Sequence, residues 1–100
     1  MQFLITARDG ETMLENRMRV RPSHLANMEK VRETGAVVCA GGILDADGRP
    51  VGSVLILDFP DRAHLDAYLE SEPYIVEKVW ADVSVQPMHA VIVKNEIIGD

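Results

Sequence analysis

The chain has 100 residues, ordinary proportions of apolar and charged side chains and a net charge of −6 at pH 7, so we expect residues 1–100 to form one soluble domain. The acidic balance repels nucleic acid phosphates, and no basic patch is present to bind an anionic membrane. No apolar segment is long enough to span a bilayer and the N-terminus lacks a signal-peptide pattern, so we expect a cytoplasmic protein with no nucleic acid or membrane partner.

The first half of the chain predicts a strand, a long helix and a hairpin. Residues 2–8 are rich in apolar and β-branched side chains and end at a turn, as a strand does. Residues 11–34 have a helical apolar period that Gly35 ends. The apolar face of that helix consists of Leu14, Met18, Leu25, Met28 and Val31. Strands follow at 36–44 and 51–59, joined by a hairpin turn, and the second of them is apolar enough to be central in a sheet.

The second half predicts a helix that opens at Pro60-Asp61 and is interrupted at residues 71–73, followed by a short helical piece over 74–80. Residues 81–93 form the last predicted strand, with an irregularity at Pro87. The order βαββαβ is that of the ferredoxin-like α+β fold, an antiparallel four-stranded sheet with helices on one face.

The other face of such a sheet has no helices over it. Strands as apolar as 36–44 and 51–59 cannot leave that face in water. We therefore expect two copies of the chain to pair their sheets face to face in a symmetric homodimer.

The first candidate site surrounds a proline. Proline disfavours helical backbone in the residue before it, so we expect a break at Arg21 and a main helix that starts at Pro22. His24 then lies in the first helical turn, where the helix dipole disfavours an imidazolium and leaves a neutral base. If the backbone stays roughly helical across the break, Arg17, Arg21 and His24 project from one side, an arrangement suited to an anionic or enolate-forming substrate. The alternative is a solvated histidine whose neighbouring arginines balance nearby glutamates.

A second proline, Pro73, opens the short helical piece, with Glu72 at the capping position before it. Glu72 is either only a helix cap or the carboxylate partner of a catalytic group. Tyr74 beside it would supply a wall or a hydroxyl donor. In the predicted fold the two helices lie side by side, which allows both proline sites to share one cleft.

No metal or cofactor is expected. His64 and His89 do not form a metal-binding spacing with His24, and the single cysteine, Cys39, is interpreted as an inert core thiol.

Two small residues in the predicted strands remain as weaker candidates for substrate binding. Gly42 does not belong to a dinucleotide-binding loop, and its lack of a side chain would allow a close approach or a bulge. Ser53 has no base near it in the sequence, so an ordinary strand serine is the default interpretation.

Five short motifs occur in order along the chain: RMRVRPSHL (17–25), AGG (40–42), GSVLI (52–56), SEPY (71–74) and VSVQP (83–87). Together they resemble the YciI-like (YCII-related) proteins. The resemblance implies the dimeric α/β barrel, in which two ferredoxin-like sheets pair.

The resemblance also implies a pair of catalytic residues. In that family the histidine of R-P-x-H and the aspartate of D-P-[FY] are regarded as a catalytic dyad. The first corresponds to His24 and the second to Glu72, where glutamate replaces the family's aspartate. Proteins similar to this family eliminate hydrogen chloride from chlorinated hydroxyquinols, and related barrels isomerise lactones, in both cases without a cofactor.

The leading hypothesis is a small cofactor-independent lyase or isomerase that acts on a cyclic, hydroxylated or carboxylated metabolite. His24 and Glu72 would transfer the proton. The substrate-binding residues would be Arg17, Arg21, Gly42, Ser53 and Tyr74. The alternative is a non-catalytic dimeric protein that binds a small ligand in the same pocket.

Overall fold

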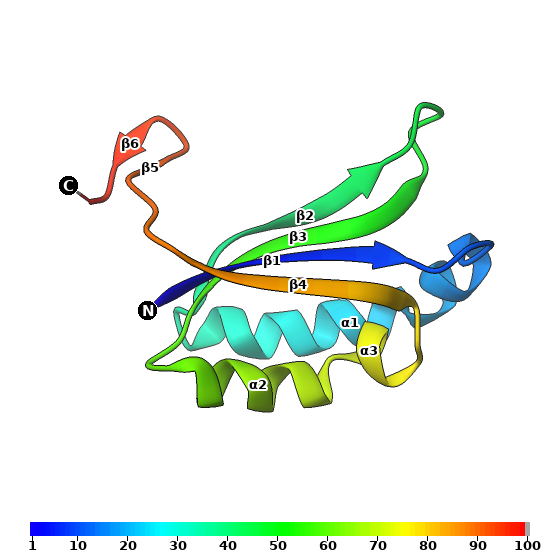
Figure 1. The fold of residues 1–100 in the computed structure, drawn as a ribbon, viewed down its shortest axis with the longest axis horizontal. Helices are drawn as coiled ribbons and strands as arrows, with labels where there is room; N and C mark the ends of the chain where they lie inside the picture. The colour runs from blue at the N-terminus through cyan, green and yellow to red at the C-terminus, as the bar shows by residue number, and fades with distance from the viewer. Residues whose placement is uncertain (100) are drawn as a thin grey trace.

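The structure, a computed structural model, describes residues 1–99 and has a four-stranded antiparallel sheet with its helices on one face (Figure 1). The elements are β1 (Gln2–Asp9), α1 (Leu14–Glu33), β2 (Val37–Leu44), β3 (Pro50–Asp58), α2 (Arg62–Ser71), α3 (Pro73–Val76), β4 (Trp80–Met88), β5 (Ile92–Val93) and β6 (Glu96–Ile97). The strand order in the sheet is β2-β3-β1-β4. The predicted βαββαβ order and α+β class are therefore confirmed, and β3 is a central strand.

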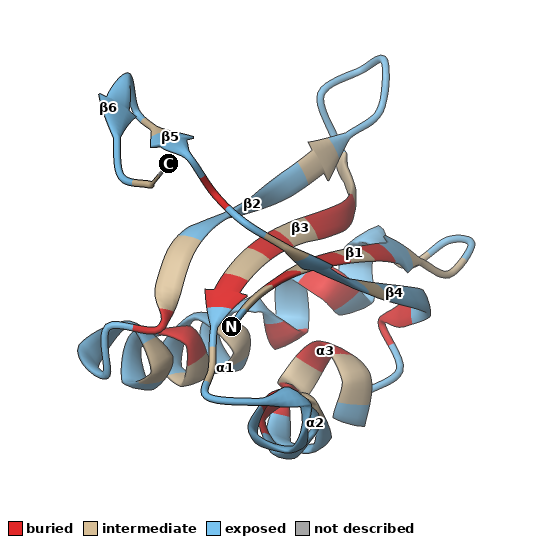
Figure 2. Cartoon of the chain, turned by 60° about the vertical axis from the view of Figure 1, so that its left-hand side comes forward, coloured by how far each residue is buried: buried red, intermediate tan, exposed pale blue. Residues whose placement is uncertain are grey.

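The two central strands form the core because their side chains alternate between the faces of the sheet. On β1, Phe3 and Ile5 are buried, and they pair with the buried Leu57 and Leu55 of β3. The buried segments of β1 and β3 lie over buried segments of the helices (Figure 2). This face is the hydrophobic core of the fold.

The opposite face of the sheet carries Leu4 and Thr6 of β1, paired with Ile56 and Val54 of β3, and all four are only partly buried. The helices lie on the other side of the sheet, and the β5–β6 hairpin projects beyond the end of β4 (Figure 1). Cys39 pairs with Ile56 and is exposed. The prediction of a core cysteine is wrong, because β2 is an edge strand.

α1 runs without interruption through Pro22, so the predicted break at Arg21 is wrong. Helical backbone before a proline is unfavourable, but a continuous α1 buries Val20 and Met28 on either side of Pro22. The free energy gained by burying these side chains exceeds the cost at Arg21. His24 consequently lies near the middle of α1, and the N-terminal dipole argument does not apply to it. The predicted apolar face is also only partly right, because Met18 and Leu25 are exposed.

The last predicted strand ends early. β4 stops at Met88, and residues 92–97 form the separate β5–β6 hairpin. Pro87 pairs regularly with Phe3, and the irregularity lies instead between Arg8 and Asp9. Proline is tolerated there because β4 is an edge strand. Within residues 1–99, no helix has the length and apolar character needed to cross a membrane.

Candidate functional site

A cleft of about 700 Å³ lies between α1 and the β2–β3 edge of the sheet. Six of the residues predicted from the sequence line it: Arg17, Arg21, His24, Gly42, Ser53 and Tyr74. Apolar side chains such as Leu25 and Met28 of α1 and Leu55 of β3 complete the wall. The cleft thus combines an apolar surface with a small set of polar groups, as small-molecule sites do.

His24 and Glu72 are in direct contact behind this cleft. Nδ1 of His24 lies 2.5 Å from Oε1 of Glu72, although the residues are 48 positions apart in the chain. The Glu72 side chain is fully buried and that of His24 is 12% exposed. Glu72 also accepts a hydrogen bond from the backbone N–H of Tyr74, at 3.1 Å, and so caps α3. The cap and the partner of His24 are one and the same carboxylate.

The plane of the His24 ring is fixed by aromatic neighbours. Tyr74 stacks on it with ring centres 4.1 Å apart and an angle of 18° between the planes, and Trp80 meets it edge-on at 6.1 Å. With Nδ1 facing Glu72, Nε2 is the ring nitrogen left for a ligand in the cleft. The arrangement can hold one tautomer of a neutral imidazole, which is what a general base requires.

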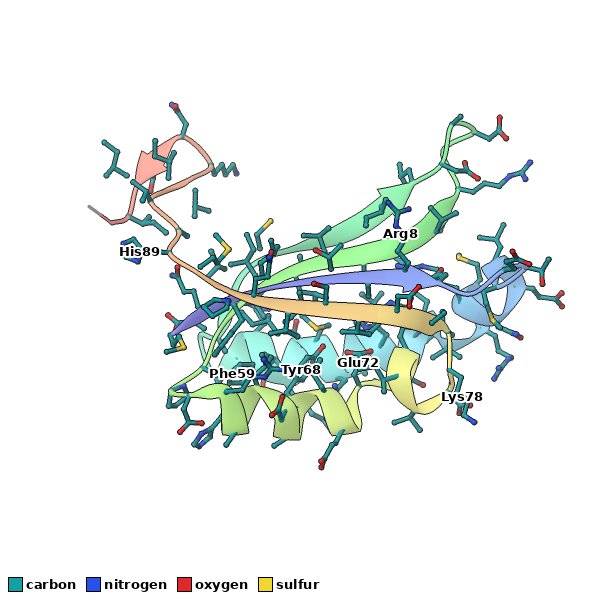
Figure 3. All side chains as sticks on the ribbon, in the orientation of Figure 1. Arg8, Phe59, Tyr68, Glu72, Lys78 and His89 are labelled. Carbon is teal, nitrogen blue, oxygen red and sulfur yellow. The ribbon has the colours of Figure 1, made fainter. Side chains whose placement is uncertain are left out.

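Tyr68 is a site residue that the sequence reasoning missed. Its hydroxyl donates to Oε2 of Glu72, and the two residues are four positions apart at the end of α2. Figure 3 labels both of them on the side of α2 that faces the sheet. Burial and the Glu72 charge raise the pKa of Tyr68, so its hydroxyl keeps the proton that it donates. The i, i+4 spacing of tyrosine and glutamate is the signal that would have found it.

Arg17 is already paired by groups of the protein. Its Nη1 contacts both oxygens of Asp9 at 2.8 and 3.1 Å, and its Nη2 donates to Oγ of Ser53 at 2.8 Å. The guanidinium also lies over the Tyr74 ring, 4.7 Å from its centre. Burial raises the pKa of Asp9, and the charge of Arg17 opposes that rise. Arg17 and Ser53 therefore build the wall of the cleft.

Arg21 differs from Arg17 because it is exposed and, within residues 1–99, lacks an acidic partner at ion-pair distance. It lines the cleft and is close enough to Tyr74 to influence its phenol: burial raises the pKa of Tyr74, and Arg17 and Arg21 oppose the rise. Of the two predicted cationic residues, Arg21 is the one available to an anionic ligand.

Gly42 lies on the helix-covered face beside Ser53, with which it pairs. A Cβ at this position would lie 4.0 Å from Nη2 of Arg17, so a longer side chain would cover the guanidinium. The glycine therefore keeps this part of the cleft open.

The other two histidines lie apart from the cleft. His64 is exposed and contacts Asp61, the N-cap of α2, and His89 is exposed beyond β4. Across residues 1–99, no cluster of three or more His, Cys, Asp or Glu side chains is placed to hold a metal ion.

Comparisons with solved structures agree with this architecture. The dehydrochlorinase TftG from Burkholderia phenoliruptrix AC1100 superposes with a TM-score of 0.83 at 24% identity, over 89% of this chain and 94% of TftG. An antibiotic biosynthesis monooxygenase superposes with a TM-score of 0.56 at 22% identity, over 91% of this chain and 98% of that one. These likenesses show that the chain shares the α+β fold of these structures.

Sequence relatives are more specific. Protein YciI from Escherichia coli O6:H1 is 31% identical over 97 residues, which cover 91% of this chain and 99% of that protein. A Haemophilus influenzae protein is likewise 31% identical over 98 residues, covering 91% of this chain and 99% of its own length. The YCII-related domain model matches residues 1–89, so the chain belongs to the YCII-related, YciI-like family.

Proposed function

We propose that this protein is a cofactor-independent enzyme, a lyase or isomerase, that moves a proton on a small cyclic hydroxylated or carboxylated substrate. The observation that carries the proposal is the contact between Nδ1 of His24, which lines the cleft, and the buried Glu72 behind it. Glu72 accepts a hydrogen bond from Nδ1–H and orients the ring, and Nε2 then serves as the base or acid. Arg21 neutralises the negative charge that develops on the substrate.

The chemistry of these groups suits two reactions. In an elimination, Nε2 takes a proton from carbon, the released electron pair forms a double bond, and the leaving group departs with its own pair. In an isomerisation, the proton is returned to a different carbon. TftG is a 5-chloro-2-hydroxyhydroquinone dehydrochlorinase and has been solved with 2,5-dihydroxybenzoquinone. This similarity supports the proposal that the present protein also acts on a ring substrate.

A non-catalytic ligand-binding protein is the second candidate. This candidate is favoured because both carboxylate oxygens of Glu72 have partners: Glu72 accepts hydrogen bonds from Tyr68 and Tyr74 and contacts His24. A carboxylate used in this way also serves as a purely structural link between α1, α2 and α3.

Chloride release from 5-chloro-2-hydroxyhydroquinone separates the two candidates. We expect His24→Asn to reduce the rate by about a hundredfold or more, the usual share of a general base, while His64→Asn turns over like the wild type. Equal rates for His24→Asn and the wild type would refute the proposal. Binding of 2,5-dihydroxybenzoquinone by calorimetry, with no turnover of any ring substrate, would establish the ligand-binding protein instead.

We also propose that the protein is a homodimer joined through the open face of the sheet. The partly buried apolar side chains Leu4, Val54 and Ile56 on that face support this arrangement. Sedimentation equilibrium is expected to give about twice the chain mass of 11.1 kDa, and Ile56→Lys is expected to give a folded monomer. A wild-type monomer at micromolar concentration would contradict the interface.

A further inference from the structure

We propose that Tyr68 is a positioning residue for the His24–Glu72 pair, which it serves by fixing the rotation of the Glu72 carboxylate. The proposal deepens the proposed function and rests on it for its catalytic meaning. The structural part of the proposal, that the Tyr68 hydroxyl determines how Glu72 faces His24, can be tested in the resting protein without a substrate.

The two oxygens of Glu72 have different partners. Oε1 receives the backbone N–H of Tyr74 at 3.1 Å and contacts Nδ1 of His24 at 2.5 Å. Oε2 receives the hydroxyl of Tyr68, its one hydrogen-bond donor within residues 1–99. The terminal torsion of a glutamate has a broad energy minimum, so the carboxylate turns easily unless both oxygens are held. Tyr68 supplies the second point of attachment.

Tyr68 is itself held in place. Its ring is buried on α2 and stacks with Phe59, with ring centres 6.0 Å apart (Figure 3). Its hydroxyl oxygen lies 3.2 Å from the sulfur of Met28 on α1. A rigid ring therefore presents its hydroxyl at a fixed point one helical turn before Glu72.

Tyr68 does not line the cleft, because the residues that line the cleft come from α1, β2 and β3 together with Tyr74 of α3. A ligand in the cleft meets His24 first, with Glu72 behind it and Tyr68 behind Glu72. Any influence of Tyr68 on a bound substrate must therefore pass through Glu72. This order is what distinguishes a positioning residue from one that contacts substrate.

The longer acid of this chain gives Tyr68 a specific purpose. Glutamate has one more rotatable bond than aspartate, so its carboxylate has more orientations to lose. A hydroxyl on Oε2 and a backbone N–H on Oε1 restrict those orientations from two sides. The same two contacts leave Oε1 directed at Nδ1 of His24.

The test is ¹⁵N–¹H NMR of the His24 side chain in Tyr68→Phe, which removes one oxygen atom and keeps the ring. In the wild type we expect the Nδ1–H tautomer with an observable, slowly exchanging proton. In Tyr68→Phe we expect a mixture of tautomers and clearly faster proton exchange, because a carboxylate held at one oxygen can turn away from Nδ1. Ser71→Ala is the matched control, because it removes a hydroxyl of the same helix that donates to the backbone carbonyl of Tyr68 at 2.8 Å rather than to Glu72.

Wild-type tautomer and exchange in folded Tyr68→Phe would overturn the proposal, as would an equal change in Ser71→Ala. If Tyr68→Phe does not fold, 4-aminophenylalanine at position 68 carries the test: its N–H donor is expected to preserve the wild-type spectrum, and a mixture of tautomers there would overturn the proposal.

Turnover provides an independent measurement with 5-chloro-2-hydroxyhydroquinone. We expect Tyr68→Phe to lower kcat about tenfold with little change in KM, and to have no further effect in a Glu72→Gln background, because both changes act through one carboxylate. Additive effects would overturn the positioning role. If the wild type does not turn over while the NMR result holds, the proposed function fails and the positioning of Glu72 by Tyr68 stands.

Discussion

Residues 1–99 contain two histidine–carboxylate pairs with similar contact distances. Nδ1 of His24 lies 2.5 Å from Glu72, and Nδ1 of His64 lies 2.7 Å from Asp61. In both pairs the carboxylate also caps a helix. The surroundings differ, because the side chains of His64 and Asp61 are 62% and 57% exposed, while those of His24 and Glu72 are 12% and 0% exposed.

The difference shows that the contact alone does not make a site. In the exposed pair, the hydrogen bond from His64 lowers the pKa of Asp61, but water competes for every group and screens the charges. In the buried pair, Tyr68, Tyr74 and His24 all face one carboxylate that has no access to water. An orientation imposed there persists, which makes it useful for catalysis.

The largest effect on stability is expected when each carboxylate is removed. Glu72→Ala leaves a partly buried histidine, a buried tyrosine hydroxyl and a backbone N–H without their acceptor, and should cost about 3 kcal/mol of unfolding free energy. Asp61→Ala loses an exposed cap and should cost clearly less. Urea unfolding of both variants measures the difference, and equal losses would remove the distinction between the pairs.

An intermediate effect on the free energy of unfolding is expected at alkaline pH from Tyr68, which donates to the carboxylate of the buried pair. Because burial and the Glu72 charge raise the pKa of Tyr68, the folded protein holds the phenol proton more tightly than the unfolded chain does. The resulting stabilisation is complete below the unfolded pKa of about 10 and is lost as pH rises above it.

The loss can approach about 1.4 kcal/mol per pH unit. Tyr68→Phe, which has no phenol at this position, should lose less stability than the wild type between pH 9 and about pH 11. Urea unfolding across that range decides the matter, and parallel curves would show that the Tyr68 proton is not linked to folding.

The smallest effect is expected at the exposed pair. His64→Ala should leave the urea midpoint within experimental error of the wild type, because an exposed ion pair contributes little and Asp61 keeps its cap to the backbone N–H of His64. Added 1 M salt should not change that result. A clear destabilisation by His64→Ala would show that this pair resembles the buried one more than its exposure suggests.

The fold could be predicted because its signals are local. Turn residues and apolar periods identify each strand and helix from a few neighbouring positions. The two proline sites show where local signals stop being sufficient. Glu72, before Pro73, has the extended backbone that the rule requires, with ψ of 117°, whereas Arg21, before Pro22, lies inside continuous helix. At Arg21, the packing of α1 on the sheet overrides the local backbone preference.

Both members of the buried pair are candidates from the sequence, and the family resemblance implies that they form a dyad, but the geometry of their contact and the place of the Tyr68 hydroxyl were not predictable. Each depends on how far α2 and α3 lie from α1, which is determined by side chains across the whole core. Arg17 illustrates the same point, because its pairing with Asp9 and Ser53 joins three elements. Sequence patterns identify residue types on a helix face and do not show which charges the protein itself neutralises.

The separation of His24 and Glu72 along the chain has a further consequence. His24 belongs to the first strand–helix–strand half and Glu72 to the second, 48 positions later. A fragment that ends in the turn between β2 and β3 would contain the histidine and Arg17 but no acid for the histidine to face. When heat or denaturant separates α1 from α3, the contact between His24 and Glu72 is lost in the same step that exposes the core. Natural selection for the pair is then also selection for the cohesion of the two halves.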